Sequence, residues 1–220
     1  MTAKVGVVVF PGSNCEHDVV EAVDSIGGSG ELLWHKDTHL GDVDAVVLPG
    51  GFAHGDYLRT GAMARFSPIM EAVCRFAHDG GPVVGICNGF QILAEAQLLP
   101  GALYKNRGLK FLCQPTTLRV ESTGSVLTRS LSEGDELNVP INHFEGNYVC
   151  SEKTLEELRD RNQIVLTYRD NPNGATADIA AICNETGNVV GLMPHPERAA
   201  HPLLGSTDGA LLLKGLLSDD

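Results

Sequence analysis

The chain has 220 residues, 43% hydrophobic and 20% charged, which is the composition of an ordinary globular protein. Its formal net charge of −12 argues against nucleic acids and anionic membranes as partners, because both bind basic surfaces. No apolar run approaches the roughly 20 residues of a membrane span, and the cysteines show neither a Cys-x-x-Cys pair nor an export signal before them, so we expect reduced thiols and a cytoplasmic location.

The first half of the chain alternates apolar runs with helical patterns. The expected strands are Lys4–Phe10, Leu32–Trp34, Asp44–Pro49 and Val83–Ile86, and the expected helices are Glu16–Ile26, Met63–His78 and a third that follows Cys87. Ser13 or Asn14 is expected near the cap of the first helix. This alternation predicts right-handed crossovers and a doubly wound parallel sheet whose carboxyl edge binds ligands.

The second half changes to shorter strands of an antiparallel type. The expected strands are Leu118–Glu121, Asn138–Ile141, Gln163–Tyr168, Ala180–Cys183 and Val189–Met193, of which the last two flank a hairpin turn. A capping box at Thr154 opens a helix to Asn162, and a closing helix covers Leu203–Leu217. We therefore expect residues 1–220 to form a single α/β domain, with a mixed, largely parallel sheet flanked by helices on both faces.

Cys87 is the candidate nucleophile. It follows a buried strand, has glycines at positions 85 and 89, and precedes a helical pattern at once. Such a sharp strand-to-helix turn holds a side chain exposed at the sheet edge. The helix N-terminus offers free N–H groups and a positive dipole end, and both favour a thiolate.

His195 and Glu197 are the candidate partners of Cys87. Pro194 and Pro196 restrict the backbone on both sides of His195. Residues two apart in an extended segment point to the same side, so Glu197 can orient the imidazole toward a thiol. Cysteine, histidine and carboxylate together form a nucleophilic triad.

A thiolate that attacks a carbonyl also needs donors for the oxyanion. The backbone N–H of Gly51 or Phe52, after the Gly50-Gly51 pair, is one candidate, and the N–H of Asn88 is another. Gln91, one helical turn beyond the cysteine, is placed to reach the substrate pocket.

Simpler interpretations exist for each of these residues. A cysteine in an apolar segment is usually a core residue, and the other five cysteines, at positions 15, 74, 113, 150 and 183, are taken as core or incidental. His195 between two prolines is also compatible with a stiff turn. A zinc site made by Cys87 and His195 lacks paired-ligand spacing, so we expect no metal. The catalytic interpretation is favoured because three separated segments each supply one required part.

The motifs Gly85–Gln91, Pro49–Gly51 and Pro194–Glu197 together resemble the class I, triad-type glutamine amidotransferases, which have a flavodoxin-like fold. Within that class, the chain resembles the glutaminase subunits of phosphoribosylformylglycinamidine synthase at Phe10–Cys15, Gly50–Arg59, Asn88–Leu93 and Met193–Arg198. The resemblance runs nearly from end to end of the chain. One departure is Phe144, where the family usually has a small residue.

This resemblance implies a role in purine biosynthesis. Cys87 would attack the side-chain amide of glutamine, with His195 transferring protons and Glu197 orienting it, and would release ammonia and then glutamate. The ammonia would pass to a separate synthetase subunit that converts formylglycinamide ribonucleotide to the amidine, and a small third subunit would bridge the two. ATP and Mg²⁺ are expected on the synthetase and no cofactor on this chain, because no Gly-x-x-x-x-Gly-Lys-Ser/Thr run occurs.

Two other functions are alternatives to this one. A stand-alone γ-glutamyl or amide hydrolase would have the same triad, and a catalytically silent regulatory subunit would not need it. We also expect the residues around Cys15, Asp56-Tyr57 and 144–148 to face a partner.

Overall fold

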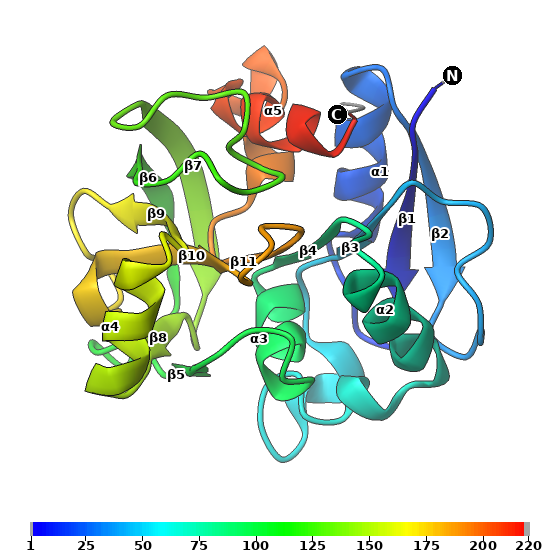
Figure 1. Ribbon diagram of the computed structural model, residues 1–220, viewed down its shortest axis with the longest axis horizontal. Coiled ribbons are helices and arrows are strands. Elements are labelled where there is room, and N and C mark those ends of the chain that lie inside the picture. The colour runs from blue at the N-terminus through cyan, green and yellow to red at the C-terminus, as the bar shows by residue number, and fades with distance from the viewer. Residues whose placement is uncertain (1, 218–220) are drawn as a thin grey trace.

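The computed structural model describes residues 2–217 and places one nine-stranded sheet at its centre (Figure 1). The strand order is β2-β1-β3-β4-β11-β10-β9-β6-β7, and β5 and β8 form a separate pair. The strands are β1 Lys4–Val9, β2 Ser29–Trp34, β3 Ala45–Leu48, β4 Val83–Ile86, β5 Ala102–Tyr104, β6 Leu112–Val120, β7 Glu136–His143, β8 Asn147–Val149, β9 Ile164–Tyr168, β10 Ile179–Cys183 and β11 Val189–Leu192. The helices are α1 Glu16–Ser25, α2 Pro68–His78, α3 Asn88–Glu95, α4 Glu152–Asp160 and α5 Asp208–Leu213.

Five neighbouring strands, β2-β1-β3-β4-β11, are parallel. Strands β3, β4 and β11 are buried at every position, as expected for short apolar runs that are covered on both faces. The other half of the sheet, β10-β9-β6-β7, is antiparallel and joins the parallel half through the β10–β11 hairpin. The predicted mixed, largely parallel α/β fold is confirmed.

The helices cover both faces of the sheet. Figure 1 shows α1 and α5 on one side of the central strands and α2 and α3 on the other, with α4 beside the antiparallel half. No helix between residues 2 and 217 combines the length and apolar character that a membrane crossing needs.

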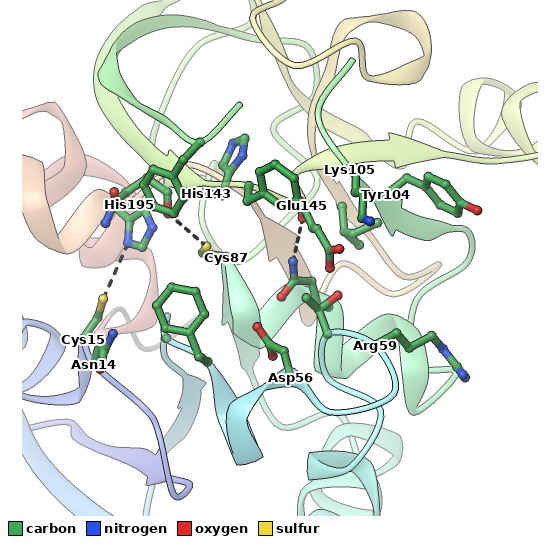
Figure 2. A pocket seen from close by; sticks show the side chains of 18 of the residues that line it. Asn14, Cys15, Asp56, Arg59, Cys87, Tyr104, Lys105, His143, Glu145 and His195 are labelled. Atoms are coloured by element: carbon green, nitrogen blue, oxygen red, sulfur yellow. Dashed lines mark hydrogen bonds between the residues drawn. The ribbon is translucent and has the colours of Figure 1, made fainter. Parts of the chain in front are cut away.

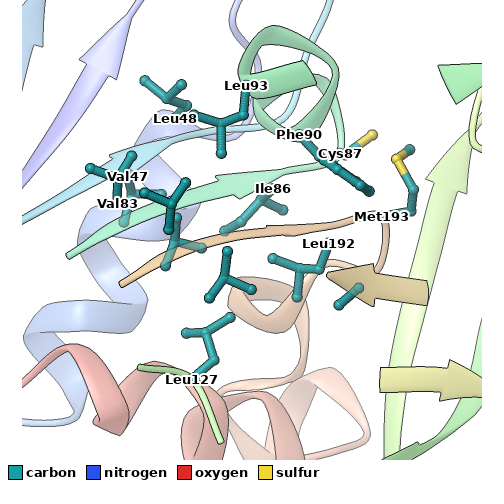
Figure 3. Close-up of a cluster of buried hydrophobic side chains, with 14 of the residues drawn as sticks. Val47, Leu48, Val83, Ile86, Cys87, Phe90, Leu93, Leu127, Leu192 and Met193 are labelled. Atoms are coloured by element: carbon teal, nitrogen blue, oxygen red, sulfur yellow. The ribbon is translucent and has the colours of Figure 1, made fainter. Parts of the chain in front are cut away.

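The core below the carboxyl edge of the sheet is apolar and tightly packed (Figure 3). Phe90 and Leu93 of α3 are fully buried against the central strands. A Cβ at Gly191 on β11 would lie 2.1 Å from the Phe90 ring, and a Cβ at Gly89 would lie 1.9 Å from the Leu48 carbonyl oxygen. The glycines therefore let α3 approach the sheet more closely than any other residue allows.

Two predicted helices are shorter than expected. The helix expected over Met63–His78 begins only at Pro68, because the residue before a proline avoids the helical region, and Ser67 is extended with ψ of 140°. The closing helix is interrupted at Gly205, which has a left-handed φ of 91°, and α5 starts at Asp208.

The residues at the N-caps of two helices also differ from those predicted. Helix α1 is preceded by Cys15 rather than by Ser13 or Asn14, and the Ser13 hydroxyl instead accepts a hydrogen bond from the Phe10 N–H. Helix α4 is capped by Ser151, whose hydroxyl accepts from the Thr154 N–H at 3.1 Å. Strands β5 and β8 were not predicted, because three residues give too short a pattern to recognise.

We expect Gly89→Ala to destabilise the chain even though alanine is the better helix former. The added Cβ would overlap the Leu48 carbonyl, so α3 must move off the sheet, at a cost of about 3 kcal/mol or more in the free energy of unfolding. Urea denaturation measures this cost. A Cβ at Gly108 meets no atom within 4 Å, so Gly108→Ala is the control and should change stability by less than about 0.5 kcal/mol. Equal stability of the two variants would contradict this packing.

Candidate active site

The carboxyl ends of β4 and β11 bring the predicted residues together. These strands are parallel neighbours, with Ile86 paired to Leu192, so Cys87 and the Met193–Glu197 segment leave the sheet at the same edge. The Cys87 N–H donates to the Leu192 carbonyl at 2.7 Å, and the His195 N–H donates to the Pro140 carbonyl at 2.8 Å. Both backbones are therefore fixed by hydrogen bonds close to the side chains concerned.

Cys87 occupies a strained turn. Its φ of 51° and ψ of −103° lie outside the regions that residues with a Cβ prefer, and it directly precedes α3. The side chain is only 6% exposed, and its Sγ lies 3.8 Å from the Asn142 carbonyl oxygen (Figure 2). The turn therefore places the sulfur at the start of α3 and at the wall of a pocket, but the expectation of an exposed side chain was wrong, because the Asn142 backbone packs against the sulfur.

His195 and Glu197 form a short buried hydrogen bond. His195 Nδ1 lies 2.6 Å from Glu197 Oε1, and the two residues are 1% and 2% exposed. The segment after His195 is a 3₁₀ turn, Pro196–Ala199, rather than the extended segment expected, but the two side chains still meet. With Nδ1 directed at the carboxylate, Nε2 is the nitrogen left for a thiol proton, and it has no other hydrogen-bond partner among residues 2–217.

The charge state of His195 follows from its neighbours. Burial alone opposes the imidazolium, but the Glu197 carboxylate and the thiols of Cys87 and Cys15 outweigh it, and together they hold the pKa of His195 above its ordinary value of 6.5. The imidazole can therefore accept a proton from a nearby thiol, and its surroundings stabilise the imidazolium that results.

Cys15, taken from the sequence as core or incidental, lies against the same imidazole. Its Sγ is 4.0 Å from His195 Nδ1, and Arg198 Nη2 donates to this sulfur at 3.2 Å. No sequence motif links Cys15 to His195, since 180 residues separate them. Only the packing of α1 against the turn at residues 196–199 brings them together.

Cys15, His195 and Glu197 each offer a metal-ligand atom, and these atoms lie within 4.8 Å of one another. Two features fit a hydrogen-bonded group better than a cation site. The Nδ1–Oε1 distance of 2.6 Å is that of a shared proton, whereas ligands about 2.0–2.3 Å from one zinc ion stand farther apart. The Arg198 guanidinium also touches the sulfur and would repel a metal ion.

The candidate oxyanion donors differ in their availability. The Phe52 N–H donates to the Gly12 carbonyl at 2.8 Å, so it is not free for a ligand, and Gly51 is the better candidate of the two. Gly51 has a φ of 148°, and a Cβ there would lie 2.7 Å from the Asn14 nitrogen, which makes glycine necessary. Asn88 is the first residue of α3, where backbone N–H groups have no partner within the helix.

The side chains of Asn88 and Gln91 tie three segments together. Asn88 Oδ1 accepts from the Ala53 N–H at 3.0 Å, and Asn88 Nδ2 donates to Gln91 Oε1 at 2.8 Å and to Asp56 Oδ1 at 3.2 Å. Gln91 Nε2 donates to the Glu145 carbonyl at 2.6 Å (Figure 2). This network fixes the loop at Ala53–Asp56 and the backbone of Glu145 to the start of α3.

These residues surround one pocket of about 640 Å³, a size typical of small-molecule sites. Of the predicted residues, Gly51, Phe52, Cys87, Gln91 and His195 line it, whereas Asn88 and Glu197 are buried behind its wall. The unpredicted lining residues include Cys15, Asp56, His143, Phe144 and Glu145.

The segments expected to face a partner are only partly exposed. Cys15 is 2% exposed and Tyr148 is fully buried, so that expectation was wrong for both residues. Tyr57 is 76% exposed, as a docking residue requires.

His143, at the wall of the pocket, stays neutral. Its Nδ1 lies 3.1 Å from Asn106 Oδ1, and burial, with a contribution from His195, lowers the pKa of His143 to about 4. It therefore cannot serve as a second cationic imidazole near neutral pH.

Comparisons with known proteins place these features in a family. The family model described as a CobB/CobQ-like glutamine amidotransferase domain matches residues 2–208. The phosphoribosylformylglycinamidine synthase subunit PurQ of Rubrobacter xylanophilus is 53% identical over 215 residues, which cover 98% of each chain. The protein of that name from Parasynechococcus marenigrum is 54% identical, over 98% of this chain and 100% of its own.

Solved structures give the same result. A chain in the structure of PurLQS from Thermotoga maritima superposes with a TM-score of 0.91 at 40% identity, over 99% of this chain and 98% of that one. A glutamine amidotransferase from the same organism, 18% identical with a TM-score of 0.58, shares the fold.

We expect Glu197→Gln to reverse the direction of the shift in the His195 pKa, from above to below its ordinary value. Without the carboxylate, the effect of burial dominates, and the ring should titrate lower by about one pH unit or more. NMR of histidine ring protons measures this change. Glu156 is exposed on α4, so Glu156→Gln is the matched control and should leave His195 unchanged. Titration of His195 at the same pH in all three proteins would contradict the pairing.

We expect Asp56→Asn to stabilise the chain above pH 6. Burial, with the Glu145 charge, raises the pKa of Asp56 from 3.8 to about 6, so the folded chain holds the proton more tightly than the unfolded chain does. Ionisation of Asp56 therefore does not lower the free energy of unfolding below about pH 4. The loss grows between pH 4 and about pH 6 and is constant above that. The variant should melt about 2–4 °C higher at pH 7, with a gain that vanishes toward pH 4.

Differential scanning calorimetry across this pH range tests the Asp56 prediction. Asp170→Asn, at an exposed position, is the control and should give no pH-dependent gain. A gain for Asp56→Asn that is independent of pH would show that the carboxylate does not titrate as stated.

Proposed function

We propose that this chain, which belongs to the family of CobB/CobQ-like glutamine amidotransferase domains, is the glutaminase subunit of a phosphoribosylformylglycinamidine synthase. Relatives of that name match it from end to end at more than half identity. The observation that carries the proposal is the strained Cys87 turn, which shares one pocket with His195 while Glu197 holds the other side of the imidazole. The substrate of this subunit is glutamine, and its products are glutamate and ammonia.

The geometry supports a two-step hydrolysis. Cys87 Sγ transfers its proton to His195 Nε2 and attacks the side-chain carbonyl carbon of glutamine, while the N–H groups of Gly51 and Asn88 stabilise the oxyanion. Collapse of this intermediate breaks the C–N bond, and the His195 proton leaves with ammonia. Water, deprotonated by His195, then cleaves the glutamyl thioester to glutamate and regenerates the thiol.

Glu197 and Gln91 act without touching the scissile bond in this scheme. Glu197 accepts a hydrogen bond from the Nδ1–H of His195, which leaves Nε2 as the nitrogen that exchanges a proton with Cys87. Gln91 lines the pocket, and both ends of its amide are hydrogen-bonded, which shapes the wall against which glutamine binds.

The choice of Cys87 over Cys15 as nucleophile rests on which side of His195 each thiol occupies. Cys15 lies on the Nδ1 side, which Glu197 already takes, and its sulfur receives a hydrogen bond from Arg198. Cys87 stands at the start of α3, where N–H donors are free. A nucleophile needs both the base and the oxyanion donors within reach, and Cys87 meets both needs.

Ammonia released here needs an acceptor on another chain. The proposal assigns that step to a synthetase subunit, which holds ATP and Mg²⁺ and converts formylglycinamide ribonucleotide to the amidine, with a small bridging subunit beside it. The likeness to a chain of a PurLQS structure supports these partners. Leu58 and Phe111, two apolar lining residues of the pocket, are 85% and 49% exposed, which suits a mouth that a partner covers.

The proposal treats residues 1–220 as one glutamine amidotransferase domain in the cytoplasm. A family match over residues 2–208 and a single continuous sheet support the domain assignment. Six free cysteines, two of them in the pocket, suit a reducing compartment.

We expect Cys87→Ala to abolish glutamine-dependent synthesis in the assembled complex, with a loss of about 10³-fold or more, because the nucleophile is gone. Synthesis from added ammonium salt should persist, because the partner carries that step. Comparing the two nitrogen sources in one assay measures both activities, and Cys113→Ala, at an exposed position, is the control.

Three outcomes would contradict the proposal. Equal survival of both activities in Cys87→Ala would exclude this nucleophile. Full glutaminase activity of the wild-type chain with no response to any partner would indicate a stand-alone amide hydrolase. No glutaminase activity in the wild-type complex would indicate a catalytically silent subunit.

A further inference from the structure

Two possible hydrogen-bond acceptors lie beside Nδ1 of the His195 imidazole. Glu197 Oε1 lies 2.6 Å from Nδ1, and Cys15 Sγ approaches the same nitrogen at 4.0 Å, within the range for sulfur (Figure 2). Cys15 is 2% exposed, so water does not compete for this sulfur. The mechanism described above uses Glu197 and leaves Cys15 without a role.

The position of the Cys15 sulfur is fixed on several sides. Arg198 Nη2 donates to it at 3.2 Å, and Arg198 Nε pairs with Asp18 Oδ2 of α1 at 3.4 Å. The Cys15 N–H donates to the Gly50 carbonyl at 3.2 Å, and the Cys15 carbonyl accepts from the Val19 N–H. A thiol that packs only as a small apolar side chain needs neither a cationic donor nor this degree of fixation.

The same contacts confine the His195 ring. A Cβ at Gly50 would lie 2.7 Å from His195 Cε1 and 3.1 Å from Cys15 Sγ, so the backbone of Gly50 closes the space beside both groups. With Glu197 and Cys15 beside Nδ1, a ring that turned over would place a C–H group against both acceptors and lose the hydrogen bond to Glu197. Nε2 must then point toward Cys87.

We propose that Cys15 is a positioning residue for His195. Its sulfur, held by Arg198, is a second acceptor beside Nδ1–H, which fixes the ring orientation and stabilises the imidazolium that forms when Cys87 gives up its proton. The sulfur forms no bond to substrate and transfers no proton. This inference rests on the proposed function, because it concerns how the proposed base is held.

The test uses Cys15→Ala and Cys15→Ser in the assembled complex, with glutamine hydrolysis measured as a function of pH. Alanine removes the acceptor and leaves a cavity beside the ring, whereas serine keeps an acceptor in nearly the same place. Cys183→Ala is the matched control, because Cys183 is also a buried thiol but lies on β10, outside the pocket lining.

For Cys15→Ala we expect kcat to fall about tenfold with KM within about twofold, since the loss affects the proton acceptor and not glutamine binding. The alkaline limb of the pH profile should move to lower pH by about 0.5 pH unit, because a less stable imidazolium loses its proton earlier. Cys15→Ser should recover most of kcat. Ammonia-dependent synthesis should stay at the wild-type level in every variant, which verifies folding and assembly.

Several results would overturn the inference. These are a Cys15→Ala variant with wild-type kcat and an unmoved alkaline limb, a Cys15→Ser variant as impaired as Cys15→Ala, or an equal loss in Cys183→Ala. If Cys15→Ala does not assemble, Cys15→Val, which fills the space beside the ring without an acceptor, takes its place, and wild-type kcat with an unmoved alkaline limb in that variant counts against the role. Absence of glutaminase activity in the wild-type complex would contradict the proposed function itself, so the two failures are distinguishable.

Discussion

The backbone of Cys87 adopts a conformation that residues with a Cβ normally avoid, and neighbours on three sides hold it there. On one side, α3 is pressed onto β3 where Gly89 meets the Leu48 carbonyl. On another, the Cys87 N–H is bound to Leu192 of β11. On the third, Asn88 connects the start of α3 to the loop at Ala53. Since the packed core supplies these contacts, its stability maintains the strained turn that places the sulfur at the pocket wall.

The same region shows how an acidic protein favours the protonated form of a buried imidazole. His195 is almost inaccessible to water, so its charge depends on groups that replace hydration. Glu197 provides the balancing negative charge, and Arg198 lies beside it, next to Cys15 and paired with Asp18. The overall charge of −12 plays no part at this distance, because the nearest groups decide the balance in a poorly solvated site.

The sequence could predict those parts of the candidate site that belong to short contiguous motifs. The glycines around Cys87, the prolines around His195 and the Gly50-Gly51 pair are short motifs, and the structure places Gly51, Cys87 and His195 around one pocket. The sequence could not reveal Cys15, because its contact with His195 depends on how α1 packs against a turn 180 residues away. It also could not reveal that the Phe52 N–H is used by Gly12, since one hydrogen bond in a loop leaves no periodic signal. Helix limits were missed at Ser67 because the apolar spacing continues through the break.

The position of β11 in the sheet has a consequence for how the chain folds. It is the last strand in chain order, yet it lies in the middle of the sheet, between β4 and β10, and pairs with residues more than 100 positions earlier. Pairings of this range form late, because the entropy of closing a long loop must be overcome first. As a ribosome releases the chain, β1 to β4 and their helices are complete long before β11 emerges. In the proposed mechanism, the nucleophilic thiol is therefore made early but receives its base only when the sheet closes, so the nascent chain carries no competent site during synthesis.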